Sequence, residues 1–223
     1  MVIFDLDDTI YKEMEFVDSA CRAVADAVGS SGLLSAGEAL RIIKESPDTG
    51  KGFDNLSAVL WRLDPANGLS AERMVEIYRT HIPDIALTAS VRRTLDTLKE
   101  RDVRMGIITD GRSHTQWAKI RALGLEKYVD ADNIIVSGDT GYDKTSRVPF
   151  DMMAERNPGE RQFVYFGDNP AKDFRWPNRM GWVTVQLDDS RGNNIHSQQI
   201  NVPDDYQAAH HVASFADILA FAM

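Results

Sequence analysis

The spacing of apolar residues alternates between two periods over most of the chain. Short runs rich in Val, Ile and Phe predict strands, and stretches in which apolar residues recur every three or four positions predict helices. The predicted strands lie at residues 1–6, 103–109, 133–138, 162–168, 182–187 and 209–214. The predicted helices lie at 90–100, 113–123, 148–156, 171–180 and 215–222. This alternation indicates an α/β fold, a Rossmann-like, doubly wound parallel sheet covered by helices on both faces.

One long segment interrupts the alternation directly after the first strand. From about residue 15 to 81 the period is helical throughout, with helices predicted at 16–28, 35–45, 55–63 and 70–81. Ser35 with Glu38 three residues later has the spacing of a capping box, and Ser70 is a second N-cap candidate. We therefore predict a core domain of residues 1–11 and 86–223, and a helical domain of residues 12–85 inserted into it.

Residues 187–206 are polar and show no clear period. Loops of this length are uncommon in compact domains and are either functional or mobile. We expect a mobile loop, with a functional loop as the alternative.

Composition narrows the class of protein. The chain has 223 residues, a formal net charge of -9 and a single cysteine, Cys21. The acidic balance argues against nucleic-acid or anionic membrane partners. One cysteine allows no intrachain disulfide, and no apolar run is long enough to cross a bilayer. We expect a cytoplasmic protein, a monomer or weak homodimer, in which Cys21 is a buried small hydrophobe.

Polar residues that can carry chemistry follow four of the predicted strands. In a doubly wound sheet, ligands bind beyond the carboxyl ends of the strands, so these residues are expected to share one crevice. They are Asp5 and Asp7 after the first strand, Thr109, Asp110 and Gly111 after the second, Lys144 in the loop after the third, and Asp168 and Asn169 after the fourth.

The first of these groups predicts a metal site. Asp5 and Asp7 are two positions apart, so an extended backbone points both side chains the same way, and Asp8 elsewhere. Adjacent carboxylates repel one another, and a hard divalent cation such as Mg²⁺ offsets that repulsion. Asp168 is the natural third ligand. We predict a Mg²⁺ site formed by Asp5, Asp7 and Asp168.

Each motif also has a plainer interpretation. An acidic run after a strand is often a solvated loop or a helix cap, and most lysines lie on the surface. Asp173 fits an ordinary first helical turn, where the helix dipole favours it. The combination of four motifs at successive strand ends favours a site over these alternatives.

On these residues the sequence resembles the haloacid dehalogenase (HAD) superfamily. "VIFDLDDTI" is similar to its first motif, "IITDG" to its second, Lys144 to its third and "FGDNPAKD" to its fourth, and the helical insertion is similar to its type 1 cap. Two positions depart from the pattern. Thr145 follows Lys144 where many relatives have proline. Because of this departure, Arg147 is a minor alternative to Lys144 for the cationic role of the third motif. Asp110 stands where Asn is common, and only its backbone N–H is expected to face the ligand.

The resemblance implies a Mg²⁺-dependent phosphatase that hydrolyses a small phosphorylated metabolite. Asp5 would be the nucleophile and form an aspartyl phosphate, with Asp7 as general acid and base. Thr109, Asp110, Gly111 and Lys144 would hold the phosphoryl group, and Asn169 and Asp173 would support the metal ligands. The alternatives are a phosphomutase of the same superfamily and an interaction domain that has lost turnover. The sequence does not identify the substrate.

Overall fold

The computed structural model describes residues 1–222. The chain forms two compact units: residues 1–14 together with the chain from residue 86 onward, and residues 15–85. No helix within residues 1–222 is both long and apolar enough to cross a membrane. Each unit has its own core and is described separately.

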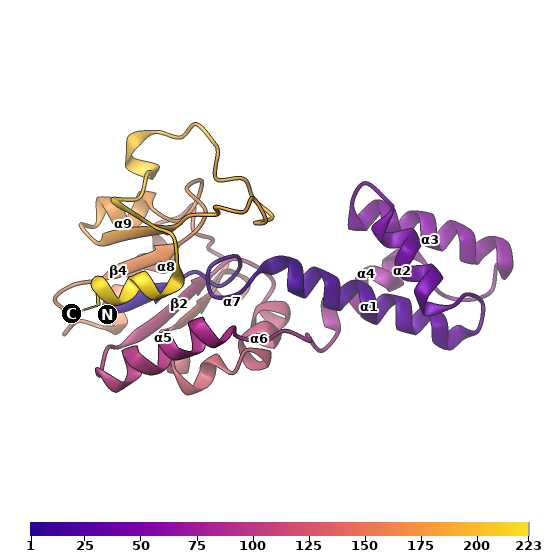
Figure 1. Ribbon diagram of the computed structural model, residues 1–223, viewed down its shortest axis with the longest axis horizontal. Helices are drawn as coiled ribbons and strands as arrows, with labels where there is room; N and C mark the ends of the chain where they lie inside the picture. Colours follow the sequence, from indigo (N-terminus) through magenta and orange to yellow (C-terminus); the bar gives the residue numbers. More distant parts are fainter. Residues whose placement is uncertain (223) are drawn as a thin grey trace. The chain divides into compact units, whose positions relative to one another are not determined.

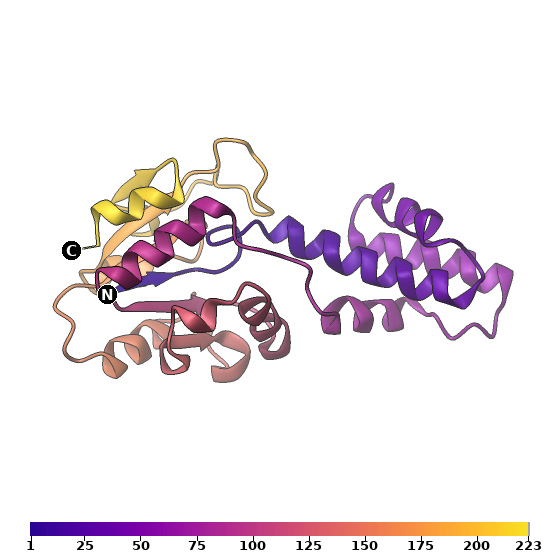
Figure 2. The same ribbon diagram turned by 60° about the horizontal axis from the view of Figure 1, so that its bottom comes forward.

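The first unit is built on a six-stranded, all-parallel sheet (Figures 1 and 2). Its strand order is β3-β2-β1-β4-β5-β6. The strands are β1 (Val2–Phe4), β2 (Met105–Thr109), β3 (Ile134–Val136), β4 (Val164–Gly167), β5 (Val183–Leu187) and β6 (His210–Val212). All six predicted strands are therefore confirmed. The chain places β2 and β3 on one side of β1, then β4 to β6 on the other, so the direction of winding reverses between β1 and β4.

Helices cover this sheet and connect its strands. They are α5 (Ala89–Glu100), α6 (Ser113–Ala122), α7 (Ser137–Thr140), α8 (Val148–Arg156) and α9 (Arg175–Arg179), with 3₁₀ segments η1 (Leu125–Lys127), η2 (Ala131–Asn133), η3 (Asp204–Tyr206) and η4 (Phe215–Ala220). Successive residues of β1 face opposite layers. Ile3 belongs to a buried cluster with Phe150 of α8, and Phe4 stacks on Phe215 of η4 at 5.4 Å between ring centroids. Both faces of the sheet are thus covered, as predicted.

Helix α9 is shorter than the sequence indicates. Helical periodicity predicts a start at residue 171, whereas α9 begins at Arg175. The intervening residues form a turn in which the Asp173 carboxylate accepts the backbone N–H groups of Asp168 and Asn169. That side chain holds the segment in a turn instead of a helix.

The second unit consists of four helices around an apolar cluster. They are α1 (Glu13–Ser31), α2 (Ala36–Lys44), α3 (Thr49–Leu63) and α4 (Ala71–Thr80), and the cluster includes Cys21, Val28, Phe53, Leu56 and Leu60. The Ser35–Glu38 capping box is confirmed. Helix α3 begins six residues before the predicted start. Its two early glycines suggested a break, but Gly52 is needed for packing, because a Cβ there would lie 2.9 Å from the backbone of Ile43.

Candidate active site

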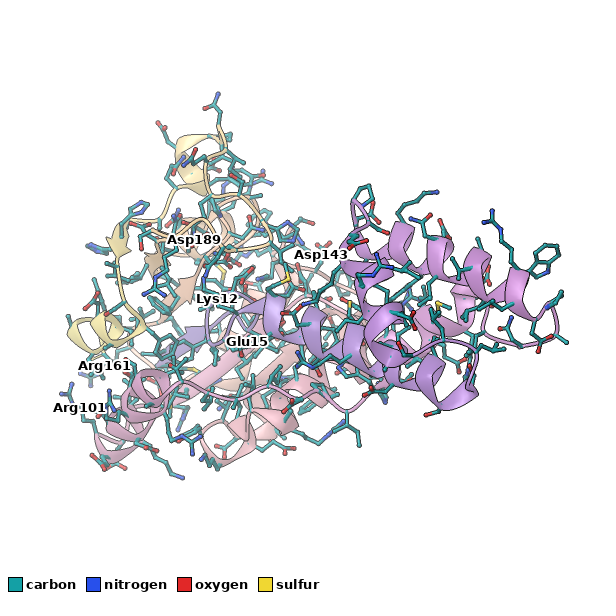
Figure 3. The ribbon with its side chains drawn as sticks, turned by 45° about the vertical axis from the view of Figure 1, so that its right-hand side comes forward. Lys12, Glu15, Arg101, Asp143, Arg161 and Asp189 are labelled. Carbon is teal, nitrogen blue, oxygen red and sulfur yellow. The ribbon has the colours of Figure 1, made fainter. Side chains whose placement is uncertain are left out.

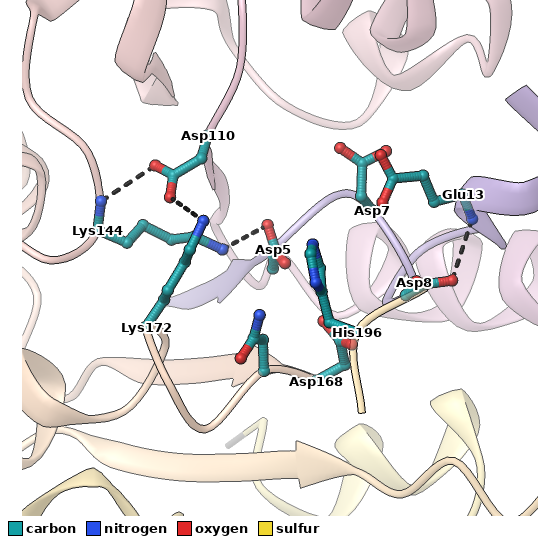
Figure 4. A pocket seen from close by; sticks show the side chains of 10 residues that line it. Asp5, Asp7, Asp8, Glu13, Asp110, Lys144, Asp168, Lys172 and His196 are labelled. Carbon is teal, nitrogen blue, oxygen red and sulfur yellow. Dashed lines mark hydrogen bonds and ion pairs between the residues drawn. The ribbon is translucent and has the colours of Figure 1, made fainter. Parts of the chain in front are cut away.

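A polar pocket of about 90 Å³ lies in the first unit, beyond the carboxyl ends of the strands (Figure 4). β1 and β4 carry Asp5 and Asp168 to it, one from each side of the point where the winding reverses. This is the position at which doubly wound sheets bind ligands. The lining residues are Asp5, Asp7, Asp8, Glu13, Asp110, Lys144, Asp168, Asn169, Lys172 and His196.

Lys144 is buried against two carboxylates in this pocket. Its Nζ lies 2.8 Å from Asp5 and 2.6 Å from Asp173. Burial lowers the pKa of Lys144, but the neighbouring Asp173 and Asp5 outweigh it and raise that pKa well above 10.5. The alternative of a surface lysine is therefore wrong. Arg147, the rival cation, is exposed and pairs with Asp151.

Asp173 is the anchor of this part of the pocket and is completely buried. Besides Lys144, it accepts hydrogen bonds from the Tyr165 hydroxyl at 3.2 Å and from the Asp168 and Asn169 N–H groups at 3.1 and 2.8 Å. A Cβ at Gly167 would lie 2.5 Å from its carboxylate, so the close approach requires glycine there. The strand end and the turn after it are thereby locked together.

Three carboxylates of the pocket can hold a cation. One oxygen each from Asp5, Asp168 and Asp173 lies within 4.8 Å of the others, and all three side chains are buried. Burial raises the pKa of Asp5 to about 8 and that of Asp168 to about 9, and the negative charge of Asp173 adds to this effect. Lys144 lowers both pKa values, but its single positive charge does not compensate for three buried acids. Buried oxygen ligands with this excess of negative charge fit a hard divalent ion such as Mg²⁺.

Asp7 lines the same pocket as Asp5, but its carboxylate has other partners. It accepts hydrogen bonds from Gln116 and Lys119 at 2.9 and 2.7 Å, and from the Tyr11 hydroxyl. Thr109 is buried at the end of β2 and accepts a hydrogen bond from the same Gln116 at 2.6 Å. The acidic trio thus contains Asp173 in the place where the sequence suggested Asp7.

Two expectations about the second motif need revision. Asp110 lines the pocket, and its carboxylate accepts the Lys144 N–H at 3.0 Å and lies 3.5 Å from the Lys172 ammonium, which counters its charge. The expectation that only its backbone faces the site is therefore wrong. The Gly111 N–H donates to the Ser137 hydroxyl at 2.9 Å and so already has a partner.

Asp8 also departs from expectation, since it lines the pocket instead of pointing away. The backbone turns at Asp8, whose φ of 55° is in the left-handed region that Asp tolerates better than most residues. Its carboxylate accepts the N–H of Glu13, the first residue of α1, at 3.1 Å. Burial raises the pKa of Asp8, and burial together with Asp7 raises the pKa of Glu13 to about 7.

The polar stretch after β5 contributes to the pocket and was not identified as part of it from sequence. Asn194 donates its side-chain amide to Asp168 at 2.8 Å, the Ile195 N–H donates to Asp8 at 2.8 Å, and His196 lines the pocket. Lys12 lies 4.0 Å from Asp189 in the same stretch (Figure 3). This segment has specific contacts with the acidic residues, which favours the functional alternative over a simply mobile loop.

The fold and this pocket define a doubly wound α/β enzyme. Its acidic and lysine side chains lie at the switch point of the sheet, which is the point where the direction of winding reverses. The family model described as haloacid dehalogenase-like hydrolase matches residues 2–186. The chain belongs to this family.

Similar proteins of known name agree with that assignment. The chain is 30% identical to a glyceraldehyde 3-phosphate phosphatase of Methanopyrus kandleri over 195 residues, 83% of this chain and 82% of that protein. It is 29% identical to the glyceraldehyde 3-phosphate phosphatase of Methanocaldococcus jannaschii over 194 residues, 83% of each chain. A HAD hydrolase of Bacillus subtilis shares the fold with a TM-score of 0.64, at 19% identity and over 99% of this chain and 97% of that one.

Proposed function

We propose that this protein is a Mg²⁺-dependent phosphatase that hydrolyses a small phosphorylated metabolite through an aspartyl phosphate on Asp5. The observation that carries the proposal is the buried Asp5 carboxylate, paired with Lys144 at 2.8 Å within an acidic trio at the switch point. The names of the two archaeal relatives support phosphate monoesters as substrates, and a triose phosphate as the first compound to test.

In the first step, an Asp5 oxygen attacks phosphorus and the bond to the leaving oxygen breaks. Asp7 donates a proton to that oxygen, so the product leaves as a neutral alcohol. In the second step, water loses a proton to Asp7 and attacks the same phosphorus, which releases phosphate and restores the Asp5 carboxylate. Covalent catalysis of this kind divides one difficult displacement into two easier ones.

The phosphoryl oxygens need donors in the same pocket. Lys144, the Thr109 hydroxyl and the Asp110 N–H are the groups we assign to this role, and fixed donors of this type usually make the largest contribution to rate. Asp5 and Asp168, supported by Asp173, would hold Mg²⁺. When bound, the ion would neutralise negative charge on the phosphoryl group. The Gly111 N–H would join the donors only if Ser137 released it.

We assign the role of a cap to the helical unit, residues 15–85. Its insertion point supports this assignment, because the chain enters it ten residues after Asp5 and leaves it just before α5. A cap that excludes water during the first step favours transfer to Asp5 over direct hydrolysis.

A phosphate-release screen tests the proposal. Short sugar phosphates, nucleotides and phosphorylated acids are incubated with Mg²⁺ or with a chelator, and Asp5→Asn is the control. We expect Mg²⁺-dependent release by the wild type alone, without a bisphosphate activator, and phosphate on Asp5 in a quenched reaction analysed by mass spectrometry. Equal rates for wild type and Asp5→Asn would overturn the assignment of the nucleophile. A requirement for a bisphosphate would indicate a phosphomutase.

A further inference from the structure

Two residues of α6 that the sequence analysis did not indicate connect two groups of the candidate active site. Gln116 and Lys119 are three positions apart on this helix, so both side chains lie on one face. Both are buried, with exposed fractions of 2% and 3%. Each contacts the Asp7 carboxylate, and Gln116 contacts Thr109 as well.

Gln116 bridges Asp7 and Thr109 through a single nitrogen. Its Nε2 lies 2.9 Å from an Asp7 oxygen and 2.6 Å from the Thr109 hydroxyl oxygen. An amide NH₂ has two hydrogens, so each can serve one acceptor. The position of the Asp7 carboxylate therefore depends on that of the Thr109 hydroxyl.

Gly111 provides the space for this bridge. A Cβ at position 111 would lie 2.8 Å from the Gln116 side chain, and the φ of 149° at Gly111 is one that other residues rarely adopt. Glycine is thus required at position 111 of the second motif for a steric reason, which does not depend on phosphate binding.

Lys119 fixes the other oxygen of Asp7. Its Nζ lies 2.7 Å from that oxygen and 3.9 Å from Glu13, and only 4% of its side chain is exposed. Burying an ammonium is costly unless it is paired, and Asp7 is a partner at hydrogen-bonding distance. Both oxygens of Asp7 are therefore held by α6, and the Tyr11 hydroxyl adds a donor from the loop after β1.

We propose that Gln116 and Lys119 are positioning residues, which hold the Asp7 carboxylate in register with Thr109 so that it meets the leaving oxygen of the substrate. The inference rests on the proposed function of Asp7. A positioning role and a purely structural role predict different effects on kcat/KM, which reports the steps up to departure of the leaving group. In those steps a displaced Asp7 impairs only substrates whose leaving oxygen needs its proton, whereas a loosened core impairs the reaction of every substrate.

The experiment compares two substrates whose leaving groups differ in their need for a proton. An alkyl phosphate, such as glycerol phosphate, leaves poorly as an alkoxide, whereas 4-nitrophenyl phosphate releases a stabilised phenolate. For Lys119→Met we expect kcat/KM to fall roughly 10- to 100-fold on the alkyl phosphate and less than about 3-fold on the aryl phosphate. Gln116→Met also frees Thr109, which would hold the phosphoryl group of either substrate, so both values should fall, with the larger loss on the alkyl phosphate. Arg121→Met, an exposed position on the same helix, is the matched control and should leave both values unchanged.

A double-variant cycle adds a second readout. Because Lys119 acts through Asp7, adding Lys119→Met to Asp7→Asn should cause no further loss on the alkyl phosphate. Equal losses on the two substrates, or additive losses in the cycle, would overturn the inference.

A third readout does not depend on turnover. In a crystal structure of Gln116→Met the Asp7 carboxylate should leave its wild-type position, and an unmoved Asp7 would contradict the inference whatever the activity. Gln116→Met introduces no charge, so it keeps the test available if Lys119→Met does not fold. A wild type that lacks Asp5-dependent phosphate release would instead contradict the proposed function, which separates the two failures.

Discussion

The ammonium of Lys144 lies 2.6 Å from Asp173, and both side chains are buried. Their loops are 29 residues apart in sequence, and this contact joins them beneath the pocket. Lys144 also contacts Asp5 at 2.8 Å. One positive charge is therefore paired with both Asp5, the proposed nucleophile, and Asp173, which holds the turn after β4.

Lys144→Met should therefore reduce both stability and activity. It leaves two buried carboxylates without their cation, a change that typically costs about 3–5 kcal/mol. Urea unfolding measures the loss, which should be smaller at acidic pH, where Asp5 is protonated. Arg147→Met is the matched control, since it removes an exposed partner of Asp151 and should cost less than about 1 kcal/mol. Similar losses for the two variants would show that Lys144 is not the buried cation.

The stability of the metal-free protein should fall as pH rises. The pKa values of Asp5 and Asp168 are raised on folding to about 8 and about 9, so the folded state binds more protons than the unfolded state above pH 3.8. Their contribution to stability is therefore fully present at low pH and is lost as pH rises towards 8 to 9. Thermal unfolding with a chelator between pH 5 and 9 measures this trend, and a flat or rising Tm would contradict it.

Mg²⁺ should raise Tm more at pH 8 than at pH 5, because protons compete for the same carboxylates. At a Mg²⁺ concentration a hundredfold above Kd the gain at pH 8 is about 2.7 kcal/mol, or roughly 5–10 °C for a domain of this size. Asp168→Asn is the control and should lose most of this gain. An equal shift at both pH values would argue against binding at these acids.

Asn194→Ala should weaken Mg²⁺ binding. The Asn194 amide orients Asp168 through a 2.8 Å hydrogen bond, and loss of such a partner usually reduces metal affinity about 10- to 100-fold. Isothermal titration calorimetry measures the affinity directly. Asn193→Ala is the control, because that side chain is exposed and the residue is its immediate neighbour. If both variants bind Mg²⁺ like the wild type, the loop does not support the metal ligands.

Gly52→Ala should destabilise the helical unit. The new Cβ would lie 2.9 Å from the backbone of Ile43, which forces α2 and α3 apart, and overpacking of this kind costs about 1–3 kcal/mol. Gly50→Ala, in the same helix, places its Cβ 3.3 Å from the Asp48 side chain, which can move more easily than backbone, and should cost less than Gly52→Ala. Thermal unfolding followed by circular dichroism compares the two, and an unchanged Gly52→Ala would show that the helices adjust freely.

The strand ends explain which parts of the site are predictable from sequence. Asp5, Thr109 and Asp168 follow apolar runs directly, and the rule that ligands bind at the carboxyl ends of parallel strands brings them together. Lys144 was expected in the same crevice because its loop follows the third strand. Its role required the family resemblance, because nothing in that loop distinguishes it from a surface lysine.

Other parts could not be predicted, because they depend on tertiary placement. Gln116 and Lys119 look like ordinary polar residues of a surface helix, and only the rotation of α6 against the sheet brings them to Asp7. Asn194 lies in a stretch without periodicity, so no pattern indicated its contact with Asp168. In the helical unit, the glycines of α3 suggested a break because sequence alone does not reveal a close approach of two helices.

The imbalance of charge around the pocket has a consequence for the order of binding. Six carboxylates line it, against the two ammonium groups of Lys144 and Lys172, and both ammonium groups already face acids. While these acids are ionised they repel a phosphate dianion that arrives alone. On the proposed function a cation would therefore bind first and the anionic ligand second, an order set by charge.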